Sequence, residues 1–373
     1  MATRQDKIFM QRALSLAEKG LGYVSPNPMV GCVIVSKDGE IIGEGFHERY
    51  GKAHAEVNAV RSVEDPDKLK RATVYVTLEP CSHHGKTPPC ADMLAELPIS
   101  KVVVAMEDPN PNVNGKGLSN LKENDIQVEV GLLEKEAKKL NEKWLHALGT
   151  SMPFVTLKIA QTADGYVAAP NGDSKWISCK ESRALVHRWR SQDDAVLVGR
   201  NTALNDNPQL TVRLIEGRQP KRVVLDGPFV LPKNLNLFSD SFEEKTVIIT
   251  HNKKKAEEDA DPMLKMLQSN YFRGEIITVE KNDSGHMNLR EAFRKLCDSG
   301  IHSVLVEGGQ QLSSALLRQG LVDQLQLFIA PKILGGGTKS IINLNINRME
   351  DIRPFRDFIW HQSGKDMLLT ANL

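Results

Sequence analysis

The chain has 373 residues, more than one ordinary hydrophobic core needs, and this length is typical of two domains. Hydrophobic residues make up 40% and charged residues 25%, as in soluble globular proteins, and a net charge of +1 gives no global attraction for nucleic acid. Five cysteines, an odd number scattered along the chain, argue against a disulfide framework. Because the sequence has neither a bilayer-length apolar run nor the features of a secretory signal, we expect a cytoplasmic protein with no membrane partner.

The first half alternates helix and strand patterns. We expect helices at 5–19, from about 54, and at 90–96, with strands at 29–36, 40–46, 72–78, 101–106 and 126–131. The first two strands are joined by the turn residues Lys37-Asp38-Gly39 and should form a hairpin. A charged helix at 134–147 is followed by the break GTSMP at 149–153, which predicts domains at 1–145 and 146–373.

The second half repeats the alternation with shorter, nearly continuous apolar strands. Strands are expected at 153–160, 195–199, 221–226, 245–250, 275–279, 303–309 and 323–331, and helices at 180–192, 288–299 and 310–319. Buried strands alternating with helices indicate a mostly parallel sheet covered on both faces. The run KKKAEEDAD at 253–261 is interpreted as a solvated surface stretch.

The strongest chemical pattern is His54-Ala55-Glu56 followed by Glu79-Pro80-Cys81 and then Cys90. A zinc deaminase needs three protein ligands, with a fourth position for water. It also needs a carboxylate that moves protons and is not itself a ligand. His54, Cys81 and Cys90 are the expected ligands of one Zn²⁺ per chain, and Glu56 is the expected proton shuttle.

One feature departs from the general pattern. Eight residues, 82–89, separate the two cysteines where the short form has two. The alternative interpretation is two unrelated buried thiols near a surface histidine. Cys32 lies in an apolar strand and is expected in the core, while Cys179 and Cys297 have no partner pattern and receive no role.

The segments SPNPMVGCVIV, HAEVNA and TLEPCSHHGKTPPC resemble the deaminase half of the bifunctional riboflavin-biosynthesis deaminase–reductase family. In that family the long spacing between the cysteines is usual. The resemblance covers nearly the whole chain and implies an α/β fold class: a cytidine-deaminase fold for about 1–145 and a dihydrofolate-reductase-like fold for the rest. It also implies substrate contacts at Asn27, His83 and Lys86, although a turn role for Asn27 and a solvated Lys86 remain open.

Three clusters stand out in the second half, at 157–178, 198–213 and 306–317. No Rossmann or P-loop glycine motif is present. Each cluster follows an expected strand, and open α/β sheets bind ligands at the carboxyl ends of their strands. The pair Gly308-Gly309 before a helix would let a pyrophosphate approach backbone N–H groups, although such a pair is often only a tight turn.

These clusters are similar to the reductase half of the same family, which uses NADPH. The resemblance implies cofactor contacts at Ala160, Trp176, Thr202, Asp206, Gly309, Gln310, Gln311, Leu312, Ser313, Ser314 and Ala315. It implies substrate contacts at Ser174, Arg190, Leu210, Arg213 and Glu307. Arg190 and Arg213 suit a phosphate through a bidentate fork, with ion-pairing or surface arginines as the alternative. The family's Ser-Leu-Asp-Gly reads Thr162-Ala163-Asp164-Gly165 here, and Gly335-Gly336-Gly337 is expected to shape a turn near this site.

The function expected from the resemblance is a zinc-dependent deamination of a small pyrimidine ribotide followed by an NADPH-dependent reduction of its ribosyl group. A homo-oligomer is expected, with no nucleic-acid partner. The alternative is a nucleic-acid base deaminase with a C-terminal binding or oligomerisation module. The near-neutral charge and the 5% aromatic content weigh against a nucleic-acid path.

Overall fold

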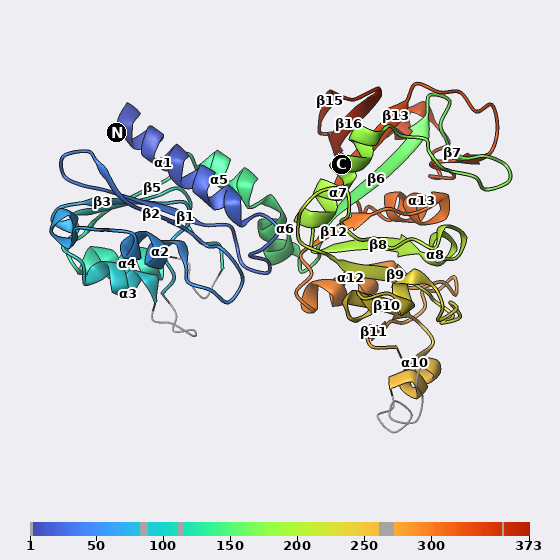
Figure 1. The fold of residues 1–373 in the computed structure, drawn as a ribbon, viewed down its shortest axis with the longest axis horizontal. Helices are drawn as coiled ribbons and strands as arrows, with labels where there is room; N and C mark the ends of the chain where they lie inside the picture. The colour runs from blue at the N-terminus through green and yellow to red at the C-terminus, as the bar shows by residue number, and fades with distance from the viewer. Residues whose placement is uncertain (1–2, 83–88, 111–114, 261–271, 353) are drawn as a thin grey trace. The chain divides into compact units, whose positions relative to one another are not determined.

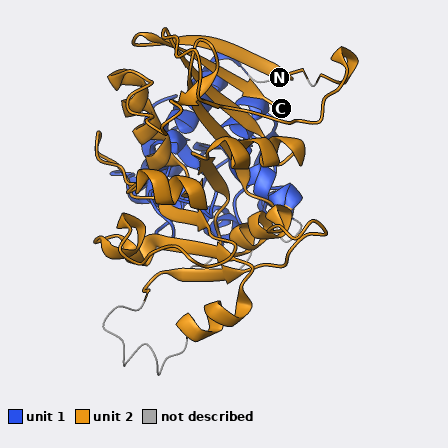
Figure 2. Ribbon diagram, turned by 90° about the vertical axis from the view of Figure 1, so that its right-hand side faces the viewer, with its two compact units in different colours: residues 1–150 blue, residues 151–373 orange. Residues whose placement is uncertain are grey.

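The structure is a computed structural model, and it describes residues 3–82, 89–110, 115–260, 272–352 and 354–373. The chain divides into two compact units, Met1–Thr150 and Ser151–Leu373 (Figure 2). Among the described helices, none is long and apolar enough to cross a membrane.

Unit 1 is a five-stranded sheet between two layers of helices (Figure 1). The strands lie in the order β2-β1-β3-β4-β5. Their bounds are β1 Gly31–Val35, β2 Ile41–Phe46, β3 Thr73–Val76, β4 Lys101–Val104 and β5 Gln127–Val130. The strands β3, β4 and β5 are parallel, whereas β1 is antiparallel to both of its neighbours.

The helices of unit 1 bury their apolar sides on opposite faces of this sheet. On one face lie α1 (Arg4–Ala17) and α5 (Glu134–Leu140), and on the other α2 (Ala55–Arg61), α3 (Cys90–Ala95) and α4 (Lys116–Glu123). The sixth helix, α6, spans Glu142–Thr150. Gly31 lets α1 approach β1 closely, because a Cβ at this position would lie 2.0 Å from the carbonyl oxygen of Ala13.

Unit 2 contains a nine-stranded sheet in the order β11-β10-β9-β8-β12-β6-β13-β16-β15. The seven strands from β11 to β13 are parallel to one another, and β16 is antiparallel to both of its neighbours, β13 and β15. Their bounds are β6 Phe154–Thr162, β8 Ala195–Gly199, β9 Lys221–Leu225, β10 Thr246–Thr250, β11 Glu275–Thr278, β12 Ser303–Val306, β13 Gln324–Ala330, β15 Asp357–Ser363 and β16 Asp366–Asn372. A separate two-stranded ribbon pairs β7 (Tyr166–Ala168) with β14 (Thr338–Lys339).

Helices cover both faces of the larger sheet. The apolar sides of α12 (Leu289–Asp298) and α13 (Gln310–Arg318) pack into one core cluster. Residues of α7 (Lys180–Gln192), α8 (Arg200–Asp206) and α9 (Asn236–Ser239) pack into two further clusters. The helix α10 spans Lys253–Ala260 within the charged run, and most of its described side chains are exposed, as expected.

The expected alternation of elements is confirmed in both units. The expected hairpin is the pair β1–β2, and the expected helix at 180–192 is α7. One correction concerns the charged helix at 134–147, which is interrupted at Asn141 and then continues to Thr150. The side chain of Asn141 bonds to both backbone polar groups of Met29, at 2.8 and 2.9 Å, which explains a polar residue at this buried position.

Candidate functional sites

Three side chains that can bind a metal converge in unit 1. His54 precedes α2, Cys90 begins α3, and Cys81 lies in the loop after β3. His54 Nδ1 is 3.6 Å from Cys81 Sγ and 3.3 Å from Cys90 Sγ, and the three ligand atoms all lie within 4.8 Å of one another. One nitrogen and two sulfur donors at this separation fit a tetrahedral Zn²⁺ that keeps one position for water.

The two thiols have opposite electrostatics in the absence of a metal. A hydrogen bond from the Cys90 side chain, and a smaller contribution from His54, lower the pKa of Cys81 to about 4. The same contact with Cys81 raises the pKa of Cys90 well above its ordinary range, so the pair retains one proton. Zinc binds cysteine as the thiolate, and binding would therefore release that proton.

Glu56 lies in the first turn of α2, two residues after His54, and is 4% exposed. Burial, with a smaller contribution from the charge on Cys81, raises its pKa to about 7. A carboxyl group with this pKa can both accept and return a proton near neutral pH. The geometry thus separates a set of ligands from an acid–base group.

Glu79, the other carboxylate of the motif, has a different task. It is 3% exposed and accepts hydrogen bonds from the N–H groups of Asp108, Gly115 and Gly117 at 3.2, 3.0 and 3.0 Å. Gly115 precedes α4 and Gly117 is its second residue. Glu79 therefore caps α4 and fixes the chain immediately before Pro80-Cys81.

Asn27 is connected to His54, one of the three possible metal ligands, through His47. Its Nδ2 is 3.2 Å from Nε2 of His47, whose Nδ1 is 3.0 Å from the carbonyl oxygen of Ala53. The ring of His47 meets that of His54 edge-on, with the ring centroids 5.6 Å apart. The other two expected substrate contacts, His83 and Lys86, lie outside the described residues.

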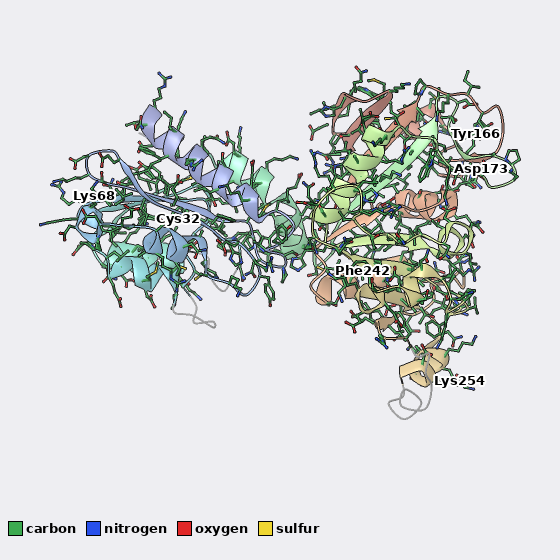
Figure 3. The ribbon with its side chains drawn as sticks, in the orientation of Figure 1. Cys32, Lys68, Tyr166, Asp173, Phe242 and Lys254 are labelled. Carbon is green, nitrogen blue, oxygen red and sulfur yellow. The ribbon has the colours of Figure 1, made fainter. Side chains whose placement is uncertain are left out.

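The remaining cysteines are not among the three converging donors. Cys32 is fully buried in β1, as expected, and Figure 3 labels it within the sheet of unit 1. Cys179 precedes α7, and its sulfur lies 3.1 Å from the carbonyl oxygen of Ser363. Cys297 lies on α12.

In unit 2, a charged group forms at the carboxyl end of β12. Glu307 follows this strand, and both of its carboxylate oxygens accept from Arg190 of α7, at 2.6 and 3.0 Å. Lys158 of β6 lies 4.0 Å from the same carboxylate. Burial alone would raise the pKa of Glu307, but the charge and hydrogen bonds of Arg190 outweigh it and lower this pKa to about 2.

The two expected phosphate-binding arginines differ in their surroundings. Arg190 also donates to the carbonyl oxygen of Thr211 at 3.0 Å, so its fork is already used within the chain. Arg213 is exposed, and the described residues provide its guanidinium with no hydrogen-bond or ion-pair partner. Leu210 is 2% exposed with its side chain in the core and a φ of 55°, so it can offer mainly its backbone to a ligand.

The N-terminal ends of two helices bring together some of the residues that are expected to contact the cofactor. Gly199 precedes α8 and Gly309 precedes α13, and these helices follow the neighbouring strands β8 and β12. A Cβ on Gly309 would lie 3.2 Å from Oγ1 of Thr202. The residues Gln310, Gln311, Leu312, Ser313, Ser314 and Ala315 form the first two turns of α13. Within them, the Ser314 hydroxyl is fully buried and bonds to the backbone of Gln310 and Ile342.

The other expected cofactor and substrate contacts come from β6, from the loop before α7 and from α8. Trp176 is 60% exposed, and the guanidinium of Arg183 stacks 4.5 Å from its ring centroid. Ser174 is half-buried in the same loop, Ala160 is half-buried in β6, and Asp206 is exposed at the end of α8. Among the described contacts, none joins these four residues to the Arg190–Glu307 pair.

The glycine run at 335–337 bends the chain before β14, and its expected place near the reductase site stays a prediction. Asp164 accepts from the N–H groups of Leu334 and Gly335, at 3.2 and 2.7 Å. Gly337 has a φ of 129°, and a Cβ there would lie 2.1 Å from the carbonyl oxygen of Ala168. The Asp-Gly turn and the glycine run are therefore held together at the β7–β14 ribbon.

Comparison with known proteins covers both units. The zinc-binding region of cytidine and deoxycytidylate deaminases matches residues 3–106, and the RibD C-terminal domain matches residues 153–368. The riboflavin biosynthesis protein RibD of Aquifex aeolicus is 41% identical over 365 residues, covering 98% of this chain and 97% of the relative. This chain belongs to the RibD family.

Solved structures of RibD proteins agree with this assignment. RibD of Acinetobacter baumannii has 37% identity and a TM-score of 0.86, with 99% of each chain covered. A Thermotoga maritima structure, described as a diaminohydroxyphosphoribosylaminopyrimidine deaminase/5-amino-6-(5-phosphoribosylamino)uracil reductase, has 39% identity and a TM-score of 0.84 and covers 99% and 98% of the two chains. The chain is a bifunctional enzyme of riboflavin biosynthesis, with a deaminase of the zinc-binding class and a reductase.

Membership of the RibD family confirms the expected α/β fold class and the expected enzyme, and it leaves the alternative of a nucleic-acid deaminase without support. The sequence analysis did not single out Lys158, His187 or His47, which the structure places at the two sites. A lysine within the mostly apolar run FVTLKIA was an available signal for the first. The spacing of His187 and Arg190, three residues apart on one helix, was a signal for the second.

Proposed function

We propose that unit 1 hydrolyses the exocyclic amino group of 2,5-diamino-6-(5-phosphoribosylamino)pyrimidin-4-one, with one Zn²⁺ held by His54, Cys81 and Cys90. The observation that carries the proposal is the convergence of these three donors beside a buried acid–base group. When bound, zinc lowers the pKa of water to about 7 and so supplies hydroxide for attack on the amidine carbon. Glu56 would pass one proton from the attacking water to the ring nitrogen. It would then pass the proton of the newly added hydroxyl group to the amino group, which leaves as ammonia as the carbonyl bond forms.

The polar groups around these ligands support recognition of a heterocycle. Nδ2 of Asn27 is directed to His47. The side-chain oxygen of Asn27 can therefore accept a hydrogen bond from the pyrimidine. We assign the substrate's phosphate to Lys86 and a further polar contact to His83, on the resemblance alone.

In unit 2 we propose reduction of 5-amino-6-(5-phosphoribosylamino)uracil by NADPH to the ribityl product. The cofactor supplies a hydride, and the chain's residues position the two reactants. The N–H groups at the start of α13, with Thr202 beside them, suit the cofactor's pyrophosphate. The cofactor also contacts Ala160, Trp176 and Asp206, on the resemblance.

The substrate of unit 2 is assigned to the charged group. Glu307, fixed by Arg190, accepts hydrogen bonds from the ribosyl hydroxyls, and Arg213 binds the phosphate. The three positive charges of Lys158, Arg190 and Arg213 and the one negative charge of Glu307 give this group a net charge of +2. This net charge favours an anionic ligand. Ser174 and the backbone of Leu210 complete the expected set, and direct contact of Arg190 with the substrate stays a prediction.

The decisive experiment combines metal analysis with a stepwise assay. The purified protein should contain about one zinc per chain. With the aminopyrimidine as substrate it should release ammonia without NADPH, and it should consume NADPH only after deamination. Cys90→Ser should lose both zinc and ammonia release. Full deamination by protein that contains no metal would overturn the proposal.

We propose further that the chain forms a homo-oligomer. β15 is the last strand of the described nine-stranded sheet, and its central residues Phe358, Ile359 and Trp360 are 59%, 60% and 47% exposed. An edge strand with apolar side chains on both faces favours pairing with a second copy. Sedimentation at increasing concentration should show a species of at least twice the mass of the chain, which is 41.5 kDa.

A further inference from the structure

The segment 209–213 is fixed by hydrogen bonds between its backbone and side chains from elsewhere in unit 2. One of these side chains is Arg190 of the charged group. It has no regular secondary structure. The carbonyl oxygen of Gln209 accepts from Arg222 and that of Thr211 from Arg190, at 3.1 and 3.0 Å. Both backbone groups of Val212 bond to the Gln219 amide at 2.8 and 2.7 Å, and the N–H of Arg213 donates to Nδ1 of His187 at 3.1 Å.

The last of these contacts concerns the residue that carries the free guanidinium. His187 lies on α7, one turn before Arg190, and is 4% exposed. Since Nδ1 accepts a hydrogen bond, the ring must be neutral, with its proton on Nε2. A protonated ring would offer Arg213 a second donor in place of an acceptor.

The surroundings of His187 maintain this neutral form. Arg190 of the same helix and Arg213 of the facing segment add positive charge, and among the described residues Glu307, after β12, opposes it. Burial and the two arginines together lower the pKa of His187 to about 4. The imidazole is thus an acceptor throughout the neutral range.

We infer that His187 is a positioning residue for substrate binding in unit 2: its neutral ring fixes the backbone of Arg213, and through it the guanidinium that binds the substrate's phosphate. This inference rests on the proposed function, which assigns the phosphate to Arg213. It predicts that His187 influences the binding of the phosphate and has little effect on the binding of NADPH.

Two variants of the full-length enzyme separate positioning from packing. His187→Asn places an amide oxygen near the position of Nδ1, so it keeps the acceptor but cannot be protonated. His187→Leu removes the acceptor and keeps an apolar side chain. Each variant is assayed for kcat/KM with 5-amino-6-(5-phosphoribosylamino)uracil and with the corresponding riboside, which lacks the phosphate.

The measured quantity is the ratio of these two kcat/KM values. His187→Leu should lower the ratio about tenfold, while His187→Asn should keep it within about threefold of wild type, as expected for loss and retention of one hydrogen bond. The KM for NADPH should not change. An equal loss on both substrates, or a His187→Asn variant as impaired as His187→Leu, would overturn the inference.

A pH comparison covers the case in which His187→Leu does not fold. Between pH 7 and pH 4 the ratio should fall about twofold further for wild type than for His187→Asn, because about half of the wild-type rings are then protonated and no longer accept from Arg213. Ionisation of the phosphate is common to both enzymes and cancels in the comparison. Identical pH profiles would exclude the positioning role.

Arg213→Ala distinguishes failure of the inference from failure of the proposed function. If this variant leaves the ratio unchanged, the assignment of the phosphate to Arg213 is wrong, and the inference falls with it. If Arg213→Ala lowers the ratio but His187→Leu does not, the proposed function stands and the role of His187 is wrong.

Discussion

At the scale of single residues, Glu56 and His54 lie two positions apart and yet have separable tasks. Because Glu56 is not among the three converging donors, Glu56→Gln should retain zinc while deamination falls by about 100-fold or more. Zinc content and ammonia release, measured on the same preparation, test this. Loss of metal from a folded Glu56→Gln variant would instead make this residue a ligand or a direct support of one.

The stability of unit 2 should depend on pH through His187. Its pKa in the folded state, about 4, lies below the ordinary value of about 6.5, so the unfolded chain binds more protons between these values. Stability is therefore present above about pH 6.5 and is lost as the pH falls toward 4. Glu307, with a pKa of about 2, stays ionised in this window.

Urea unfolding at pH 7 and pH 5 measures this effect. Wild type should lose more stability on acidification than His187→Asn, in which the group cannot be protonated. A loss of the same size in both proteins would show that the folded structure does not hold His187 neutral.

The sequence predicted the residue types of both sites better than their pairings. His54, Cys81 and Cys90 were expected together because one chemistry requires all three. The bidentate pair of Arg190 and Glu307 joins residues 117 positions apart, and no local pattern indicates it. Both residues were expected near the substrate, but the structure shows that one holds the other.

At the scale of elements, glycines decide how closely α1 and α2 approach the sheet of unit 1. In Gly31→Ala the new methyl group would overlap the backbone of α1, so unit 1 should be destabilised by about 1–3 kcal/mol. Gly149→Ala is the matched control, because nothing lies within 4 Å of its Cβ and it lies in α6. The control should be neutral or more stable by about 0.5–1 kcal/mol.

Thermal unfolding of the two variants gives the comparison. The prediction fails if Gly31→Ala is as stable as Gly149→Ala, which would mean that α1 can move away from β1 without loss.

Two elements that the sequence did not predict, α4 and β15, lack a local sequence pattern that would indicate them. The helix α4 begins after a glycine without a capping side chain of its own, and its cap is Glu79, 36 residues earlier than Gly115. The edge strand β15 is exposed on both faces, so it lacks the alternation that marks a half-buried strand. By contrast, α7 and the buried parallel strands carry their patterns locally and were predicted well.

At the scale of the whole molecule, we propose that residues 146–373 form a domain that folds alone. The strands and core clusters of unit 2 come entirely from residues after 150. This fragment should bind NADPH and reduce the deaminated intermediate. A soluble, folded fragment that binds no NADPH would count against this division of the chain.

The two chemistries should also be separable within the intact chain, because they use no residue in common. Glu56→Gln should release no ammonia but still oxidise NADPH when the deaminated intermediate is supplied. Arg213→Ala should accumulate that intermediate from the aminopyrimidine. If Glu56→Gln, properly folded, failed to reduce the supplied intermediate, a single composite site would replace two sites.

The strand order of unit 2 also has a consequence for biosynthesis of the chain. The five described strands of unit 1 end at Val130, so they leave the ribosome while unit 2 is being translated, and unit 1 can fold during that time. In unit 2, β12 lies between β6 and β8, although it follows them by more than a hundred residues. The centre of this sheet, and Glu307 with it, cannot form until β12 has been translated. Ribosome-bound nascent chains stalled before β12 should therefore already bind zinc, whereas the NADPH site forms last.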